Sequence, residues 1–152
     1  MIPEPASERE LAPDAAEGSP LLALQRATHA TLQVLAAELV DLDLTASEIN
    51  ALAILSDGRG RTVSRLGAAA GTRPTTLTSV LDRLERRGHI TRGTRAGDRR
   101  VVVIELTPSG RLTADTIRRT VTGLEERAIG RLPAEAVAGF HAVIRALSEV
   151  TS

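Results

Sequence analysis

Arginines crowd the segment RGTRAGDRRVVVIELTPSG, which runs from residue 92 to residue 110. Arg92, Arg95, Arg99 and Arg100 fall within nine positions, together with two glycines and the single acid Asp98. A guanidinium group is always charged, and its five N–H donors match the oxygens of a phosphate. This cluster is therefore suited to binding a polyanion, and Asp98 could orient a neighbouring arginine through a charge-assisted hydrogen bond.

The charge of the chain is unevenly distributed, although the formal net charge is zero. Residues 59 to 111 contain twelve of the nineteen arginines and only four acids, whereas the remaining residues contain seven arginines and fifteen acids. The alternative is a solvated surface with scattered charges. Such a strong bias instead predicts that the middle third of the chain contacts a polyanion.

The sequence gives little support to other kinds of site. His29, His89 and His141 lie far apart and the chain has no cysteine, so we expect no metal ion. No nucleophile with a paired base and no phosphate-binding glycine loop at a helix start is present, so we expect neither enzyme activity nor a cofactor. The absence of tyrosine and tryptophan disfavours a protein that stacks the bases of single strands.

Length and composition predict one soluble domain. The chain has 152 residues, of which 42% are hydrophobic and 25% are charged, and it has no apolar run of membrane-spanning length. Residues 1–19 carry five carboxylates and one arginine, lack the pattern of a secretory signal, and are expected to be a disordered acidic leader. The domain is then residues 20–152, and the absence of cysteine fits a cytoplasmic protein.

The apolar residues that flank the basic segment recur with helical periods. From residue 20 to residue 40 they return at every third or fourth position, which predicts a long helix with one apolar face. Thr45 and Glu48 have the spacing of a capping box, so a second helix is expected over about residues 45 to 56. Residues 62 to 71 predict a short helix that Thr62 caps and Gly71 ends.

The next helix has the most informative polar side. Pro74 stands in its first turn and Gly88 ends it. Two short helices joined by a turn with a glycine make a helix-turn-helix, whose second helix lies in the major groove of DNA. Its polar side holds hydroxyl residues near the start and arginines further along, the types that contact base edges and phosphates. These polar residues are Thr75, Thr76, Thr78, Ser79, Asp82, Arg83 and Arg86.

The hydrophobic period changes after Gly88. HITRG and RRVVVIEL are rich in β-branched residues, and TRAGD between them has the glycine of a hairpin turn. A hairpin directly after a helix-turn-helix is a wing, and the arginines at its tip are suited to a narrow minor groove. Arg61 and Arg65, which begin the short helix before the turn, are candidate phosphate contacts.

Two further helices are expected toward the C terminus. One begins at Thr107 and continues to about Ile129, and another begins at Pro133. The last helix has two apolar stripes, and in so small a chain two stripes require a second burial partner. The pattern predicts a homodimer whose interface is formed by residues 20–41 and 111–152.

The order of these motifs resembles the MarR family (multiple-antibiotic-resistance regulators) of winged-helix transcription factors. The specific match covers residues 44 to 110, and the flanking helices match only in length and pattern. The matching residues are Leu44, Thr45 and Glu48 of an LT-x-x-E helix start; Asp82, Arg83, Leu84 and Gly88; Asp98 and Arg100; and Leu106, Thr107 and Gly110 of an LT-x-x-G start.

The resemblance implies a mainly helical fold with a small β-hairpin wing, in which a winged helix-turn-helix is flanked by N- and C-terminal dimerisation helices. It implies a homodimeric regulator of transcription that binds double-stranded DNA, with repression of a palindromic operator as the expected mode. Many members release DNA when a small molecule, often aromatic or phenolic, binds between the two lobes. Phe140 is the single aromatic residue and cysteine is absent, so stacking of an aromatic effector and peroxide sensing are disfavoured and the effector stays open.

The resemblance also implies which residues contact DNA. In its wing motif the acid orients an arginine toward DNA, and Asp98 and Arg100 correspond to that pair. The alternative is a dimeric winged-helix protein that has lost operator binding and acts through protein–protein interaction. The full set of expected contacts is Thr75, Thr76, Thr78, Ser79 and Arg83 on the recognition helix, Arg95, Asp98, Arg99 and Arg100 on the wing, and Arg61 and Arg65 before them.

Overall fold

The structure is a computed structural model that describes residues 18–151. The expected leader therefore lies almost entirely outside the described residues. The chain divides into two compact units, residues 1–38 and residues 39–152, which are described separately. In the first unit the described element is helix α2 (Pro20–Glu38), and none of its residues is buried.

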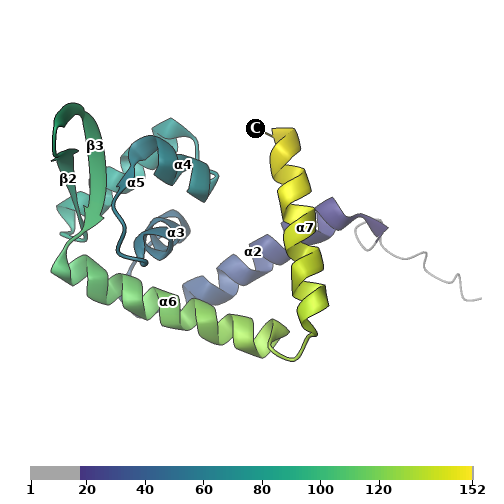
Figure 1. The fold of residues 1–152 in the computed structure, drawn as a ribbon. Coiled ribbons are helices and arrows are strands. Elements are labelled where there is room, and N and C mark those ends of the chain that lie inside the picture. The colour runs from purple at the N-terminus through teal and green to yellow at the C-terminus, as the bar shows by residue number, and fades with distance from the viewer. Residues whose placement is uncertain (1–17, 152) are drawn as a thin grey trace, which may run out of the picture. The chain divides into compact units, whose positions relative to one another are not determined.

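The second unit holds the other elements. They are η1 (Val40–Leu42), α3 (Ala46–Leu55), β1 (Arg61–Thr62), α4 (Val63–Ala70), α5 (Pro74–Arg86), β2 (Ile90–Arg95), β3 (Asp98–Leu106), α6 (Pro108–Ile129) and α7 (Ala134–Thr151). In Figure 1 the β2–β3 hairpin lies beside α5, and α6 begins at the base of the hairpin. The expected fold class, mainly helical with a β wing and flanking helices, is confirmed.

Capping residues set the helix starts that the sequence predicts. The Thr45 hydroxyl accepts from the Glu48 amide at 3.2 Å, and the Glu48 carboxylate accepts from the Thr45 amide at 3.0 Å. Thr62 and Thr107 each cap a helix through one hydrogen bond, at the start of α4 and of α6. Gly71 ends α4 with a φ of 60°, and this left-handed residue turns the chain toward α5.

The wing differs from the expected two-stranded hairpin, because it is a three-stranded antiparallel sheet in the order β1–β3–β2. Arg61 of β1 lies opposite Ile104 of β3. A strand of two residues is too short to show a hydrophobic period, so the sequence could not predict it. The turn between β2 and β3 consists of Ala96 and Gly97, and Gly97 has a φ of 89°.

A single hydrophobic core joins α3, α4, α5, the sheet and the first half of α6. Its largest fully buried side chains are Leu52, Leu55, Leu66, Val80, Leu81, Leu84, Ile90, Ile104 and Ile117. By contrast, α7 has no buried residue, and Phe140 and Val143 on it are about half exposed. The lobe that carries the recognition helix is thus packed within one chain, whereas the apolar face of α7 is uncovered. No helix among residues 18–151 is long and apolar enough to cross a membrane.

Candidate nucleic-acid interface

Helix α5 presents its polar side to solvent. All four of its hydroxyl residues, Thr75, Thr76, Thr78 and Ser79, are exposed. The Thr78 hydroxyl donates to the Pro74 carbonyl, and the Ser79 hydroxyl donates to the Thr76 carbonyl, both at 2.9 Å. A hydroxyl that donates in this way still has a lone pair that can accept, and it can also rotate to donate elsewhere. The whole row therefore remains able to contact a base edge.

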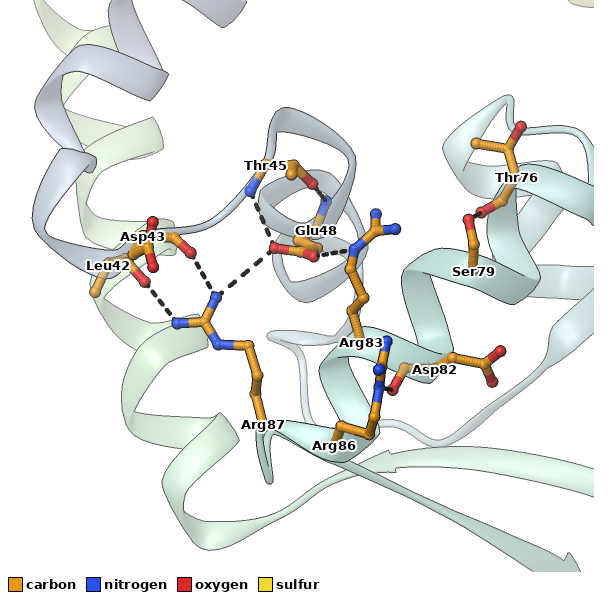
Figure 2. Close-up of polar contacts among 10 residues, drawn as sticks. All are labelled: Leu42, Asp43, Thr45, Glu48, Thr76, Ser79, Asp82, Arg83, Arg86 and Arg87. Atoms are coloured by element: carbon orange, nitrogen blue, oxygen red, sulfur yellow. Dashed lines mark hydrogen bonds and ion pairs between the residues drawn. The ribbon is translucent and has the colours of Figure 1, made fainter.

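Arg83, on the same helix, is bound to a buried carboxylate of α3. Its Nε donates to Glu48 Oε1 at 2.6 Å, and the side chain of Glu48 is only 3% exposed while that of Arg83 is 39% exposed. Arg87 lies 3.9 Å from the other carboxylate oxygen and also donates to the main-chain carbonyls of Leu42 and Asp43 (Figure 2). Arg83 was predicted from the sequence to contact DNA, but one of its N–H donors already binds Glu48 within the protein.

Glu48 has two roles at once, because it caps α3 and receives Arg83. Burial raises the pKa of its carboxyl group, but hydrogen bonds from Arg83 and Thr45 and the nearby charges of Arg83 and Arg87 outweigh burial and keep the pKa below its usual value. The ionised carboxylate ties the start of α3 to the C-terminal half of the recognition helix. The spacing of Thr45 and Glu48 predicts the capping role. The contact with Arg83 could not be predicted from local sequence, because the two residues are 35 positions apart.

Arg92 belongs to the arginine cluster of the sequence, but its side chain is bound within the protein. Its Nη2 donates to Asp82 Oδ1 at 2.6 Å, and its Nε lies 3.9 Å from Glu85 Oε2. Arg92 thus joins strand β2 of the wing to the recognition helix. Sequence reasoning missed this contact because its two ends belong to different secondary-structure elements.

The tip of the wing leaves three arginines exposed, Arg95, Arg99 and Arg100. Their side chains make no hydrogen bond and no ion pair with any other residue that the structure describes. Asp98 Oδ1 accepts from the main-chain amide of Arg100 at 2.9 Å. In the structure this carboxylate fixes the backbone of the wing, and the orienting of the Arg100 guanidinium toward DNA by Asp98 stays a prediction.

The two arginines before the turn differ in their surroundings. Arg61 forms a bidentate ion pair with Asp57 at 2.7 and 2.9 Å and donates to the Ile54 carbonyl at 2.8 Å. Hydrogen bonds from the Arg61 guanidinium and the Arg59 amide lower the pKa of Asp57 to about 2. Arg65 is exposed, and its guanidinium makes no such contact in residues 18–151. Asp57 lies in the turn after α3 and Arg61 lies on β1, so the helical i, i+4 rule does not apply to this pair and the sequence alone did not predict it.

The structure brings most of the predicted residues to one region of the second unit. The helix α5 contacts β2, and Arg65 at the start of α4 lines a common cleft with Arg95 of the wing. An exposed row of hydroxyls on one helix, beside a hairpin with free arginines, is suited to a duplex: the helix fits a major groove and the hairpin a minor groove. Among residues 18–151 no group of three or more histidine or acidic side chains could hold a metal ion.

Comparisons with known proteins find similarity to a family of transcriptional regulators. A model of the MarR family matches residues 44–102. A MarR family transcriptional regulator from Silicibacter pomeroyi is 27% identical, with a TM-score of 0.76, over 91% of this chain and 94% of that one. Comparison with curated proteins finds no match.

Two more distant structures share the fold. CouR from Rhodococcus jostii RHA1, solved with bound p-coumaroyl-CoA, is 23% identical, with a TM-score of 0.79, over 89% of this chain and 95% of that one. MepR from S. aureus, solved as a complex with DNA, is 22% identical, with a TM-score of 0.72, over 86% and 96% of the two chains.

Proposed function

Since the chain belongs to the MarR family of winged helix-turn-helix transcriptional regulators, which bind DNA and are not enzymes, we propose that it is a homodimeric repressor of a palindromic operator. The observation that carries the proposal is the exposed row of hydroxyls on α5, a helix that contacts strand β2 of the wing, together with the exposed arginines at the tip of the wing. Base edges are read by short polar side chains in the major groove, and phosphates and the minor groove attract arginine.

The proposal gives each predicted residue a role. The hydroxyls of α5 read bases, Arg65 contacts a phosphate, and Arg95, Arg99 and Arg100 enter or flank the minor groove. Arg61, Arg83 and Asp98 act mainly by holding the loop before β1, the recognition helix and the wing in place. Residues 44–110 then form the DNA-binding lobe, residues 20–41 and 111–152 form the dimer, and the protein acts in the cytoplasm.

Two of the similar structures were solved with a bound partner. MepR was solved with DNA and CouR with p-coumaroyl-CoA. Both support the proposal that this chain binds an operator and responds to a small molecule. The chemical class of that effector is open.

Replacing Arg100 with glutamine is expected to weaken the binding of operator and non-operator duplexes by about the same factor. One lost phosphate contact lowers the slope of log K against log salt by about 0.9. Fluorescence anisotropy of labelled duplexes over a range of salt concentrations measures this slope. Arg145→Gln, which removes the same charge from an exposed position on α7, should leave the slope unchanged.

An Arg100→Gln slope equal to that of the wild type would exclude a phosphate contact by Arg100. Failure of the wild-type protein to bind duplex DNA at low salt would refute the proposed function. That result would favour the alternative, a winged-helix dimer that acts through protein–protein contacts.

The wild-type protein is expected to form a dimer of twice the chain mass of 16.1 kDa in light scattering. The reason is the uncovered apolar surface of α2 and α7, where Leu21, Leu22, Phe140 and Val150 are all exposed. Phe140→Glu should shift the protein toward the monomer, whereas Arg145→Gln should not. A wild-type monomer at micromolar concentration would contradict the proposed assembly.

A further inference from the structure

A cleft of about 650 Å³ lies between the start of α4 and the wing. Its lining comes from the loop before β1, from β1 itself, from the first turn of α4 and from both strands of the hairpin. Four arginines line it, Arg59, Arg61, Arg65 and Arg95, against one carboxylate, Glu105. Its volume falls within the range of small-molecule sites, but its lining is cationic and has no aromatic side chain.

Three of these arginines have free donors. The guanidinium of Arg61 is used by Asp57, but the side chains of Arg59, Arg65 and Arg95 make no hydrogen bond or ion pair within residues 18–151. Thr94 adds a hydroxyl from the wing. Because the arginines outnumber the carboxylates around this open cleft, an anion that enters it is attracted by their combined charge.

The loop that carries Arg59 is held in place before any ligand binds. Asp57 accepts from the Arg59 amide at 3.0 Å and binds the Arg61 guanidinium. Gly60 packs so closely that a Cβ there would lie 2.7 Å from Val103 Cγ1 on β3. A ligand that enters the cleft therefore meets a largely preorganised rim, which lowers the entropic cost of binding.

We propose that this cleft is a phosphate-binding site and that Arg59 contacts its ligand. A guanidinium group can donate two parallel hydrogen bonds to two oxygens of one phosphate. A cleft lined by the guanidinium groups of Arg59, Arg65 and Arg95 is therefore suited to a pyrophosphate-like group. The phosphates can come from the DNA backbone beside the wing or from a free phosphorylated molecule. The inference rests partly on the proposed function, because Arg65 and Arg95 are shared with the DNA-contacting set, and a free ligand would then compete with DNA.

The first arm of the test uses the full-length protein without DNA. Inorganic pyrophosphate is titrated by calorimetry at low ionic strength, and saturable binding is expected. Arg59→Gln and Arg65→Gln should each raise the Kd about tenfold. Arg99→Gln, which removes a wing charge that does not line the cleft, should leave it unchanged.

The second arm measures duplex binding by Arg59→Gln as a function of salt. Displacement of duplex by pyrophosphate supports a free phosphorylated ligand, whereas a salt slope lower by about 0.9 without pyrophosphate binding supports the DNA backbone as the source. If pyrophosphate does not bind and the slope does not change, the proposal is overturned. A wild-type protein that binds pyrophosphate but no duplex would refute the proposed function and leave the phosphate site intact.

Discussion

Gly110→Ala is expected to lower the free energy of unfolding by about 3 to 5 kcal/mol. A Cβ built on Gly110 lies 1.8 Å from the His89 carbonyl oxygen and 2.7 Å from its carbonyl carbon. Both atoms belong to the main chain, so no rotamer change can relieve the overlap. Gly110 is itself buried in the first turn of α6.

Hydrogen bonds prevent the two segments from moving apart. The His89 carbonyl accepts from the Thr107 amide at 3.0 Å. The Thr107 hydroxyl donates to the Gly88 carbonyl and accepts from the Gly110 amide at 2.9 Å. Any shift that makes room for a methyl group at residue 110 breaks the cap of α6 or its bond to the end of the recognition helix. This contact is the physical reason for glycine in the LT-x-x-G motif.

Urea unfolding followed by circular dichroism measures the change. Gly123→Ala is the matched control in the same helix, because a Cβ there meets only Arg127 Nη1 at 3.6 Å. With the higher helix propensity of alanine, this control should be neutral or stabilise the protein by up to about 1 kcal/mol. Equal destabilisation by the two substitutions would show that glycine flexibility, and not the contact with His89, explains residue 110.

The parts of the fold that follow from local chemistry could be predicted from the sequence. Thr45 with Glu48, Thr62 and Thr107 set the helix starts, and Gly71 ends α4, because caps involve residues only a few positions apart. The strand β1 could not be predicted, since its two residues become a strand only by pairing with β3, more than forty positions later.

In the candidate site, too, some features could be predicted from the sequence and others could not. The exposure of the α5 hydroxyls follows from the helical period, and the wing arginines follow from the hairpin turn at Gly97. Arg83 and Arg92 were harder to place, because their partners Glu48 and Asp82 lie on other elements. Composition shows that an arginine is present, but only the tertiary structure shows whether its guanidinium is free for DNA.

Arg83→Met is expected to lower the free energy of unfolding at pH 7 by about 2 kcal/mol. The substitution leaves Glu48 as a buried carboxylate whose nearest remaining cation is Arg87 at 3.9 Å. Breaking a fully buried pair costs more, about 3 to 5 kcal/mol, but the side chain of Arg83 is 39% exposed, so solvent already weakens this pair. Methionine preserves most of the apolar stem, which isolates the loss of the charge.

The effect of Arg83→Met should also depend on pH. Glu48 has a folded-state pKa below its usual value of 4.5, so its ionisation stabilises the folded protein above that pH. This contribution is lost as the pH falls through the folded-state pKa. Arg83→Met removes the hydrogen bond that lowers this pKa most, so the difference in stability between wild type and variant should shrink as the pH decreases below about 4.5.

Arg86→Met is the control that distinguishes the loss of the Arg83–Glu48 ion pair from the loss of any positive charge on α5. Arg86 lies three positions further along the helix, is exposed, and its Nε makes only a 3.4 Å hydrogen bond to the Asp82 carbonyl. Its substitution should change the free energy of unfolding by no more than about 0.5 kcal/mol, with no change in pH dependence. If Arg83→Met is equally mild and equally insensitive to pH, then the contact with Glu48 does not stabilise the fold. Any loss of DNA affinity in that variant would then report a direct contact of Arg83 with DNA, because the orientation of the recognition helix would be unchanged.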